Sequence, residues 1–197
     1  MCQASHHDES GYVFTFDEFP SVLAAARQNA EWAWTALYRA YAPDVLRYLR
    51  ARGADDAEDL LGEVFVQVVR GVPGFEGDAA AFRSWVFMIA HNRLVDAWRR
   101  GARQMVDYVP DELLLSVTDD GRTEDEVERG LGEERVRVLL DRLAPDQRDV
   151  LTLRIIADLS IEQVAAVLGK TPGAVKSLQH RGLERMRKGL SRKGVSL

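Results

Sequence analysis

The residues best suited to chemistry lie near the C-terminus, in the stretch "GKTPGAVKSLQHRGLERMRK" at positions 169–188. This stretch holds seven basic residues, counting His180, and one acid. Basic side chains gathered on one helix are typical of contact with a polyanion. The whole chain is acidic, with a formal net charge of -5, so its positive charge is concentrated rather than spread.

Charge changes sign in blocks along the chain. Residues 1–31 hold five acids and one base, and residues 83–103 hold five arginines and one acid. Residues 103–132 then hold nine acids and three arginines, whereas residues 170–193 hold eight bases and one acid. Two basic blocks separated by an acidic one predict two separate contacts with nucleic acid.

The C-terminal basic block follows the pattern of a helix-turn-helix. Ser160 suits a helix N-cap, and Gln163 stands three residues later, as in a capping box. Gly169 can adopt the left-handed conformation that ends a helix. Thr171 then caps a second helix that begins with Pro172, a residue favoured at the first helical position. The spacing predicts two helices joined by a tight turn.

The second of these helices has an apolar face and a polar face. The apolar face consists of Val175, Leu178, Gly182, Met186 and Leu190. The outward, polar face consists of Lys176, Ser177, Gln179, His180, Arg181 and Arg185. A solvated basic helix is the alternative interpretation, but the capped helix and short turn before it favour insertion into the major groove.

The rest of the chain is also predicted to be helical, because no segment sustains the alternation of apolar and polar residues that is typical of a β-strand. Helices are expected over Glu18–Asn29, Glu31–Arg52, about 56–72, Ala79–Arg100, Glu133–Arg142, Pro145–Ala157, Ser160–Leu168 and Pro172–Leu190. The acidic segment between the fourth and fifth of these lacks a helical period and is expected to be a linker. The apolar segment 12–30 is expected to pack either on the first helical domain or on a partner.

Several classes of function are excluded or disfavoured. The chain has no run of 18 apolar residues and no signal-peptide layout, so a cytoplasmic location is expected. Cys2 is the only cysteine. Cys2, His6 and His7 favour a flexible tail over a metal site, because a fourth ligand is missing. No phosphate loop, metal-spaced cluster or catalytic triad is found, so we expect no enzyme, cofactor or metal.

Two longer stretches resemble a known family. "DDAEDLLGEVFVQVVRGVPGF" with "FRSWVFMIAHNRLVDAWRR" looks like region 2 of a bacterial sigma factor of the extracytoplasmic-function (ECF) group. "LAPDQRDVLTLRIIADLSIEQVAAVLGKTPGAVKSLQHRGLERMRK" resembles region 4 of the same group. The resemblance covers about residues 19–190 and implies an all-α fold, with two small helical domains joined by a flexible acidic linker. The expected division is a tail at 1–17, a region 2-like domain at 18–102, the linker at 103–132, a region 4-like domain at 133–190 and a tail at 191–197.

The resemblance also implies three sets of binding residues. Core RNA polymerase, through the clamp helices of its largest subunit, would contact Glu58, Asp59, Gly62, Glu63 and Gln67. The minus-10 promoter element would be read and opened by Asn92, Arg93, Asp96, Trp98, Arg99 and Arg100, with the pocket for a flipped-out base near Asp96. The minus-35 element would be read by the outward face of the C-terminal helix, Lys176, Ser177, Gln179, His180, Arg181 and Arg185.

The function implied is that of a promoter-specificity subunit, which binds core RNA polymerase and directs promoter recognition and melting. Its partners would be core polymerase, promoter DNA and an anti-sigma factor, without membrane insertion, and it would join the nucleoid when bound to polymerase. A stand-alone helix-turn-helix regulator that binds operators as a dimer is the alternative. That alternative leaves residues 31–100 to serve as a dimerisation or sensor domain.

Overall fold

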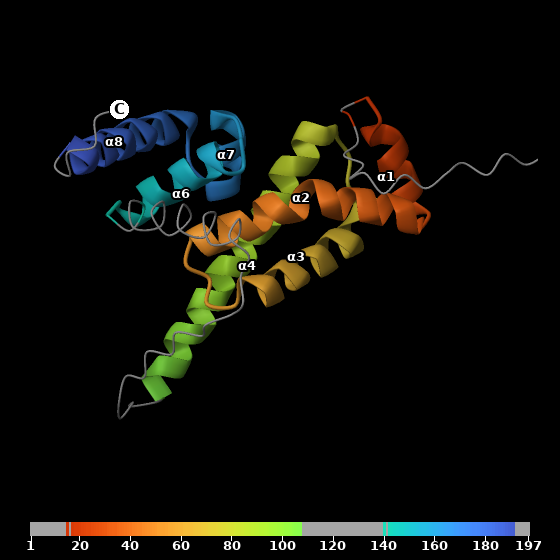
Figure 1. The fold of residues 1–197 in the computed structure, drawn as a ribbon, viewed down its shortest axis with the longest axis horizontal. Helices are drawn as coiled ribbons and strands as arrows, with labels where there is room; N and C mark the ends of the chain where they lie inside the picture. Colours follow the sequence, from red (N-terminus) through yellow and green to blue (C-terminus); the bar gives the residue numbers. More distant parts are fainter. Residues whose placement is uncertain (1–14, 16, 108–139, 141, 192–197) are drawn as a thin grey trace, which may run out of the picture.

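The computed structural model describes residues 15, 17–107, 140 and 142–191 of the chain. These residues form helices and contain no β-strand. In chain order the helices are α1 (Phe19–Arg27), α2 (Glu31–Ala51), α3 (Ala57–Gly71), the 3₁₀ turn η1 (Val72–Gly74), α4 (Ala79–Asp107), α6 (Pro145–Ile155), α7 (Ile161–Leu168) and α8 (Pro172–Ser191) (Figure 1). The expected all-α fold is confirmed.

The N-terminal half is a bundle in which α1, α3 and α4 pack around α2. Its centre is a cluster of aromatic rings around Phe82 of α4, which is fully buried. The rings of Phe19, Tyr41, Phe75 and Trp85 all have centroids within 5.5 Å of the Phe82 ring. Because these rings come from α1, α2, α4 and the turn after η1, a single cluster ties the bundle together.

Helix α1 belongs to this bundle. Phe19, Val22 and Ala26 are buried in the core, and Arg27 donates side-chain hydrogen bonds to the carbonyls of Val72 and Phe75. Of the two sites expected for the segment 12–30, the first helical domain is therefore where its described part packs.

Helix α4 is longer than its sequence pattern indicated. It was expected to end at Arg100, but it continues to Asp107 and projects away from the other helices (Figure 1). Gly101 directly follows the expected end of this helix, and a single glycine inside a helix costs only about 1 kcal/mol relative to alanine. The expected helix Glu133–Arg142 and most of the expected linker lie outside the described residues.

The C-terminal half packs α6, α7 and α8 against one another. Gly182 of α8 lies directly against α6, since a Cβ built on it would be 2.8 Å from Leu151 Cδ1. The absence of a side chain at this position lets the two helices approach closely.

The two halves are also in contact with each other. Helix α7 packs on α4, and α6 touches α2. Buried residues of both halves, among them Phe82 of α4 and Val164 of α7, join in one continuous core. Helical patterning does not predict this contact, because each half carries a complete helical pattern of its own.

Candidate nucleic-acid and partner interfaces

The turn between α7 and α8 is built as the sequence predicted. The Ser160 hydroxyl accepts a hydrogen bond from the Gln163 backbone N–H at 3.2 Å, and Gln163 Oε1 accepts one from the Ser160 N–H at 2.7 Å. Gly169 has a left-handed backbone, with φ of 62°. The Thr171 hydroxyl accepts a hydrogen bond from the Ala174 N–H at 3.2 Å and so caps α8. These local bonds fix the angle at which α8 leaves α7.

The outward face of α8 is exposed to solvent at most of the expected positions. Lys176, Ser177, His180, Arg181 and Arg185 are all exposed. The Arg181 side chain is held along the helix by a hydrogen bond from its Nε to the Ser177 carbonyl at 3.2 Å. This face meets the requirement for groove contact, namely polar and basic side chains near a helix N-terminus.

Gln179 is different from its neighbours. It is only half-exposed, and its Oε1 is buried without a hydrogen-bond partner among the described atoms. The sequence placed Gln179 on the outward face, whereas in the structure it lies at the edge of the helix toward the interior. A position between Leu178 and His180 on the helical wheel is at the boundary between the two faces, so sequence spacing does not decide it.

The predicted minus-10 residues lie on the second half of α4. Asn92, Trp98, Arg99 and Arg100 are exposed, and Arg93 and Asp96 are half-exposed. Asp96 and Arg99 form an ion pair one helical turn apart, with 3.7 Å between Asp96 Oδ1 and Arg99 Nη1. One face of the Trp98 ring is covered by the guanidinium of Arg52, which lies 5.0 Å from the ring centroid. An exposed ring flanked by arginines is suited to stacking on unpaired bases.

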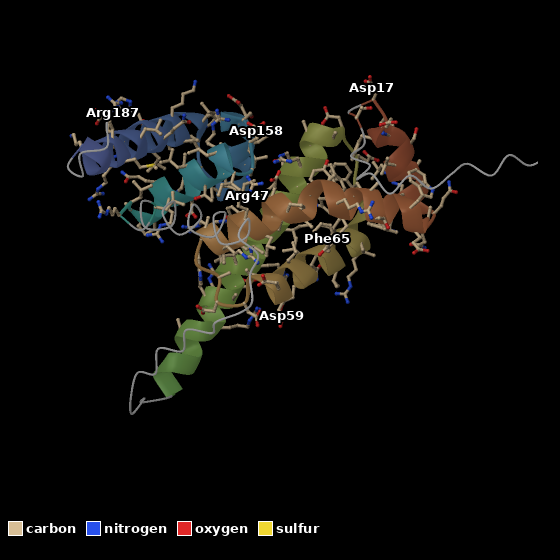
Figure 2. All side chains as sticks on the ribbon, viewed as in Figure 1. Asp17, Arg47, Asp59, Phe65, Asp158 and Arg187 are labelled. Carbon is tan, nitrogen blue, oxygen red and sulfur yellow. The ribbon has the colours of Figure 1, made fainter. Side chains whose placement is uncertain are left out.

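The acidic residues of α3 are exposed, and two of them already have basic partners. Glu58 forms an ion pair with Arg50, whose hydrogen bond holds the pKa of Glu58 below its usual value. Glu63 lies 3.8 Å from Arg100 of α4, measured between Oε2 and Nη2. Asp59 is exposed, and Figure 2 shows it near the start of α3. Gly62 is open too, since no atom lies within 4 Å of a Cβ built there.

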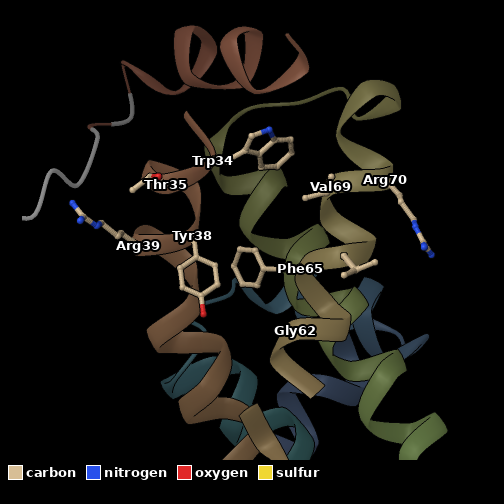
Figure 3. A pocket seen from close by; sticks show the side chains of 9 residues that line it. Trp34, Thr35, Tyr38, Arg39, Gly62, Phe65, Val69 and Arg70 are labelled. Atoms are coloured by element: carbon tan, nitrogen blue, oxygen red, sulfur yellow. The ribbon is translucent and has the colours of Figure 1, made fainter. Parts of the chain in front are cut away.

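Beside these acids lies an apolar groove of about 550 Å³ between α2 and α3 (Figure 3). Arg39 and Arg70 lie at its rim. Its walls are mainly aromatic and aliphatic and consist of Trp34, Thr35, Tyr38, Gly62, Phe65, Val66 and Val69. The rings of Tyr38 and Phe65 pack against each other in this lining, with 4.7 Å between centroids and an angle of 56° between their planes. Val66 and Val69 are 47% and 45% exposed, which is unusual for valines on a folded helix.

Helical spacing alone did not predict this groove. Phe65 and Val69 follow the same helical spacing as Leu60, Leu61, Val64 and Val68, but only the latter four of these apolar residues are buried. A signal was present in "LLGEVFVQVV", since its apolar residues cover more than the one stripe that a helix needs to pack on a core. Only Gln67 and Glu63 interrupt that run.

No metal-binding cluster of His, Cys, Asp or Glu occurs within the part of the chain that the structure describes. Cys2, His6 and His7 lie outside it. None of the described helices combines the length and apolar character that crossing a membrane requires.

Comparison with known proteins matches both halves of the chain. Residues 37–104 match the family model Sigma-70 region 2, and residues 133–186 match Sigma-70, region 4. ECF RNA polymerase sigma factor ShbA of Streptomyces griseus subsp. griseus is 33% identical over 156 residues, which cover 74% of this chain and 81% of ShbA. The chain belongs to the ECF sigma factors of the sigma-70 family.

Other relatives agree with this assignment. ECF RNA polymerase sigma factor BldN of Streptomyces coelicolor is 32% identical over 153 residues, 77% of this chain, and the match spans 58% of BldN's length. A solved structure of CnrH, in complex with the cytosolic domain of CnrY, has a TM-score of 0.65 at 22% identity and covers 89% of this chain and 99% of CnrH. At that identity the likeness shows a shared fold.

As an ECF sigma factor, the protein binds core RNA polymerase and directs transcription initiation at promoters. Region 2 comprises most of α2, α3 and most of α4, and region 4 contains the helix-turn-helix formed by α7 and α8. The alternative of a stand-alone operator-binding regulator is not favoured, since it does not account for region 2.

Proposed function

We propose that this ECF sigma factor binds core polymerase and promoter DNA through three surfaces: the outward face of α3 with its groove, the second half of α4, and the outward face of α8. The observation that carries this proposal is that each surface presents exposed polar or charged side chains, accompanied at the α3 groove by the exposed Val66 and Val69, on helices whose opposite face is buried. Residues kept in solvent on otherwise well-packed helices are available to partners.

The α3 face would dock on core polymerase. Asp59 and Glu63 supply exposed carboxylates for basic side chains of the clamp helices, and the groove beside them supplies apolar area. An apolar centre with a charged rim is the usual composition of a protein interface. The groove residues Tyr38, Phe65, Val66 and Val69 therefore join the five core-binding residues expected from the sequence.

Helix α4 would open and hold the minus-10 element. Trp98 offers a stacking surface, and Arg99 and Arg100 offer cations for the backbone of the separated strand. Asp96 would accept hydrogen bonds from a base turned out of the duplex, as the family resemblance implies. Its pairing with Arg99 keeps its charge from repelling nearby phosphates.

Helix α8 would read the minus-35 element in the major groove. Lys176, Ser177 and Arg181 stand in its first turns, where a recognition helix reaches base edges. Arg185 stands further along and would contact phosphates. Gln179, being half-buried, would support the helix position more than it would contact bases.

We also propose a catalytic class, a cellular location, a further partner and domain limits. The protein would have no catalytic activity of its own, would act in the cytoplasm and would join the nucleoid when bound to polymerase. An anti-sigma factor would be a further partner. We propose the domain limits expected from the sequence with one change: the first domain would end at Asp107, where α4 ends, and the linker would begin at residue 108.

A charge-reversal variant tests the polymerase-docking surface. Asp59→Arg combined with Glu63→Arg should abolish co-purification with core polymerase while leaving the helical content unchanged, because both positions are exposed. Glu31→Arg combined with Glu76→Arg is a matched control, since it makes the same change in net charge at exposed acids away from α3. Wild-type retention of core polymerase by the α3 variant would exclude this surface.

A further inference from the structure

The apolar groove between α2 and α3 is open to solvent within the described part of the chain. Tyr38, Val66 and Val69 on its walls are 48%, 47% and 45% exposed. Exposed apolar side chains gathered in one groove with a polar rim mark an interaction site. Burial of this surface is favourable whatever covers it, so an occupant is expected in the free protein as well as in its complex with polymerase.

The rim of the groove is positively charged. Arg39 of α2 and Arg70 of α3 are both exposed and lie on opposite sides of the groove (Figure 3). Among the described residues, neither arginine has a carboxylate partner. An apolar centre between two such arginines favours an occupant that is both apolar and acidic.

The first 14 residues of the chain, MCQASHHDESGYVF, have this composition. Asp8 and Glu9 are acidic, and no Lys or Arg accompanies them. Tyr12, Val13 and Phe14 follow after a Ser-Gly pair and are all apolar or aromatic. These residues lie outside the described part of the chain, so their match to the groove is one of chemistry.

The start of α1 is fixed beside the middle of α2. Thr15 donates its backbone N–H to Glu18 Oε2 at 2.7 Å, which holds the residues before α1 close to the helix. The rings of Phe19, at the start of α1, and Tyr41 of α2 each lie 5.3 Å from the ring of Phe82. The segment that precedes Thr15 is therefore attached to the fold at this point of α2.

This attachment point is within reach of the groove. Tyr38 lines the groove and lies on α2 about one helical turn before Tyr41. A segment of seven residues, such as 8–14, spans about 23 Å when extended. That length is several times the rise of about 4.5 Å between Tyr38 and Tyr41, so the segment can enter the groove along α2.

Attachment to the same chain favours this occupant over a separate molecule. A segment joined to its site by a few residues is present at an effective concentration in the millimolar range. A second copy of the chain is disfavoured by charge, because a symmetric groove-to-groove contact would bring Arg39 and Arg70 of one copy against the same arginines of the other.

We propose that segment 8–14 lies in this groove in the free protein, with its apolar end against the walls and its acids toward the rim arginines, and that core polymerase must displace it. The displacement rests on the proposed docking of polymerase on α3 and its groove. A groove that is occupied about two-thirds of the time binds polymerase about threefold more weakly than an open one. The segment is therefore a built-in competitor of polymerase.

Paramagnetic line broadening on the full chain tests the docking without polymerase. A nitroxide is attached at Ser10→Cys in a Cys2→Ser background, and the methyl signals of Val66 and Val69 are recorded by NMR. Both signals should broaden strongly and recover when the nitroxide is reduced. Broadening of an isotope-labelled copy without nitroxide, mixed with nitroxide-bearing copies, would place the segment in another molecule and overturn the proposal.

Tyr12→Ser with Phe14→Ser is the matched control for the label. The nitroxide and the length of the chain are unchanged, whereas both rings are lost, so most of the broadening should disappear. Broadening that is equal in this variant and in the parent chain means that proximity to α1 alone produces the signal, and the proposal is wrong.

A charge exchange tests the contact with the rim. Asp8→Lys with Glu9→Lys should reduce the broadening, because the segment then carries the same charge as the rim. Combination with Arg39→Glu and Arg70→Glu should restore it, since opposite charges again face each other. Broadening that the exchange fails to restore would contradict the assignment of the acids to the rim.

Titration with core polymerase separates this inference from the proposed function. Deletion of residues 2–14 should tighten binding about threefold, and it should have no effect in Val66→Ser with Val69→Ser, where the shared apolar surface is lost. An unchanged affinity after deletion overturns the competition. Retention of polymerase by Asp59→Arg with Glu63→Arg would instead refute the proposed docking on α3, and the methyl broadening would be unaffected.

Discussion

The groove between α2 and α3 allows a quantitative prediction about core-polymerase affinity. Complete burial of a valine side chain contributes about 1.5–3 kcal/mol. Val66 and Val69 are 47% and 45% exposed, so about half of that amount is still available at each position. Covering both with a partner should therefore contribute about 1.5–3 kcal/mol in total.

The variant Val66→Ser with Val69→Ser removes most of this apolar surface. Its dissociation constant for core polymerase should rise by about 10- to 150-fold, since each 1.4 kcal/mol corresponds to a factor of ten. Serine and valine have similar helix propensities, and both positions are exposed, so the free energy of unfolding should change by about 0.5 kcal/mol or less.

The assay is titration of labelled protein with core polymerase, with thermal unfolding measured on the same preparations. Val66→Ile with Val69→Ile is the matched control, because it keeps branched apolar side chains at both positions and should bind at least as tightly as wild type. A serine variant that is folded and binds within about twofold of wild type would refute the idea that the groove is covered by polymerase.

Four further predictions concern other surfaces. Lys176→Ala or Arg181→Ala should change which minus-35 sequences are selected from a randomised promoter library, whereas Arg187→Ala should change only the salt dependence of binding. Gly71→Ala should lower the free energy of unfolding by about 1–2 kcal/mol in chemical denaturation, because its Cβ would lie 2.5 Å from Trp85 Cζ2, and the cost of overpacking exceeds the gain in helix propensity. Acidification from about pH 7.5 to about pH 5.5 should destabilise wild type more than His91→Gln in thermal melts, since burial lowers the pKa of His91, which stays neutral in the fold while the unfolded chain takes up a proton. Replacement of Asp119, Asp120, Glu124, Asp125 and Glu126 by serine should reduce transcript yield more than promoter affinity, and equal yields would leave these acids a role in solubility alone.

Local features of the structure could be predicted from the sequence. The capping box of Ser160 and Gln163, the left-handed Gly169 and the Thr171 cap all involve residues at most three positions apart. Interactions at that range depend on residue type and spacing, which the sequence displays directly. For the same reason, most of the described helix limits differ from their expected positions by only a residue or two.

Features that depend on distant residues could not be predicted in this way. The ion pair between Arg52 and Asp149 joins helices from opposite halves, and nothing in the neighbourhood of either residue indicates the other. The groove likewise depends on how α2 and α3 pack, because this packing leaves Val66 and Val69 in solvent instead of in the core. Helical periodicity identifies an apolar face but does not say which part of it a neighbour covers.

The charge distribution disfavours promoter binding by the free chain. A net charge of -5 repels DNA at long range, whereas the basic faces of α4 and α8 attract it only within about 8 Å, the screening length at physiological salt. Long-range steering, which speeds the association of basic proteins with DNA, therefore acts against the free chain. If core polymerase docks on α3, as proposed, the acidic face of region 2 lies against the polymerase and the basic faces of α4 and α8 stay free for DNA. Promoter contact would then become favourable because the partner holds the protein close to the duplex.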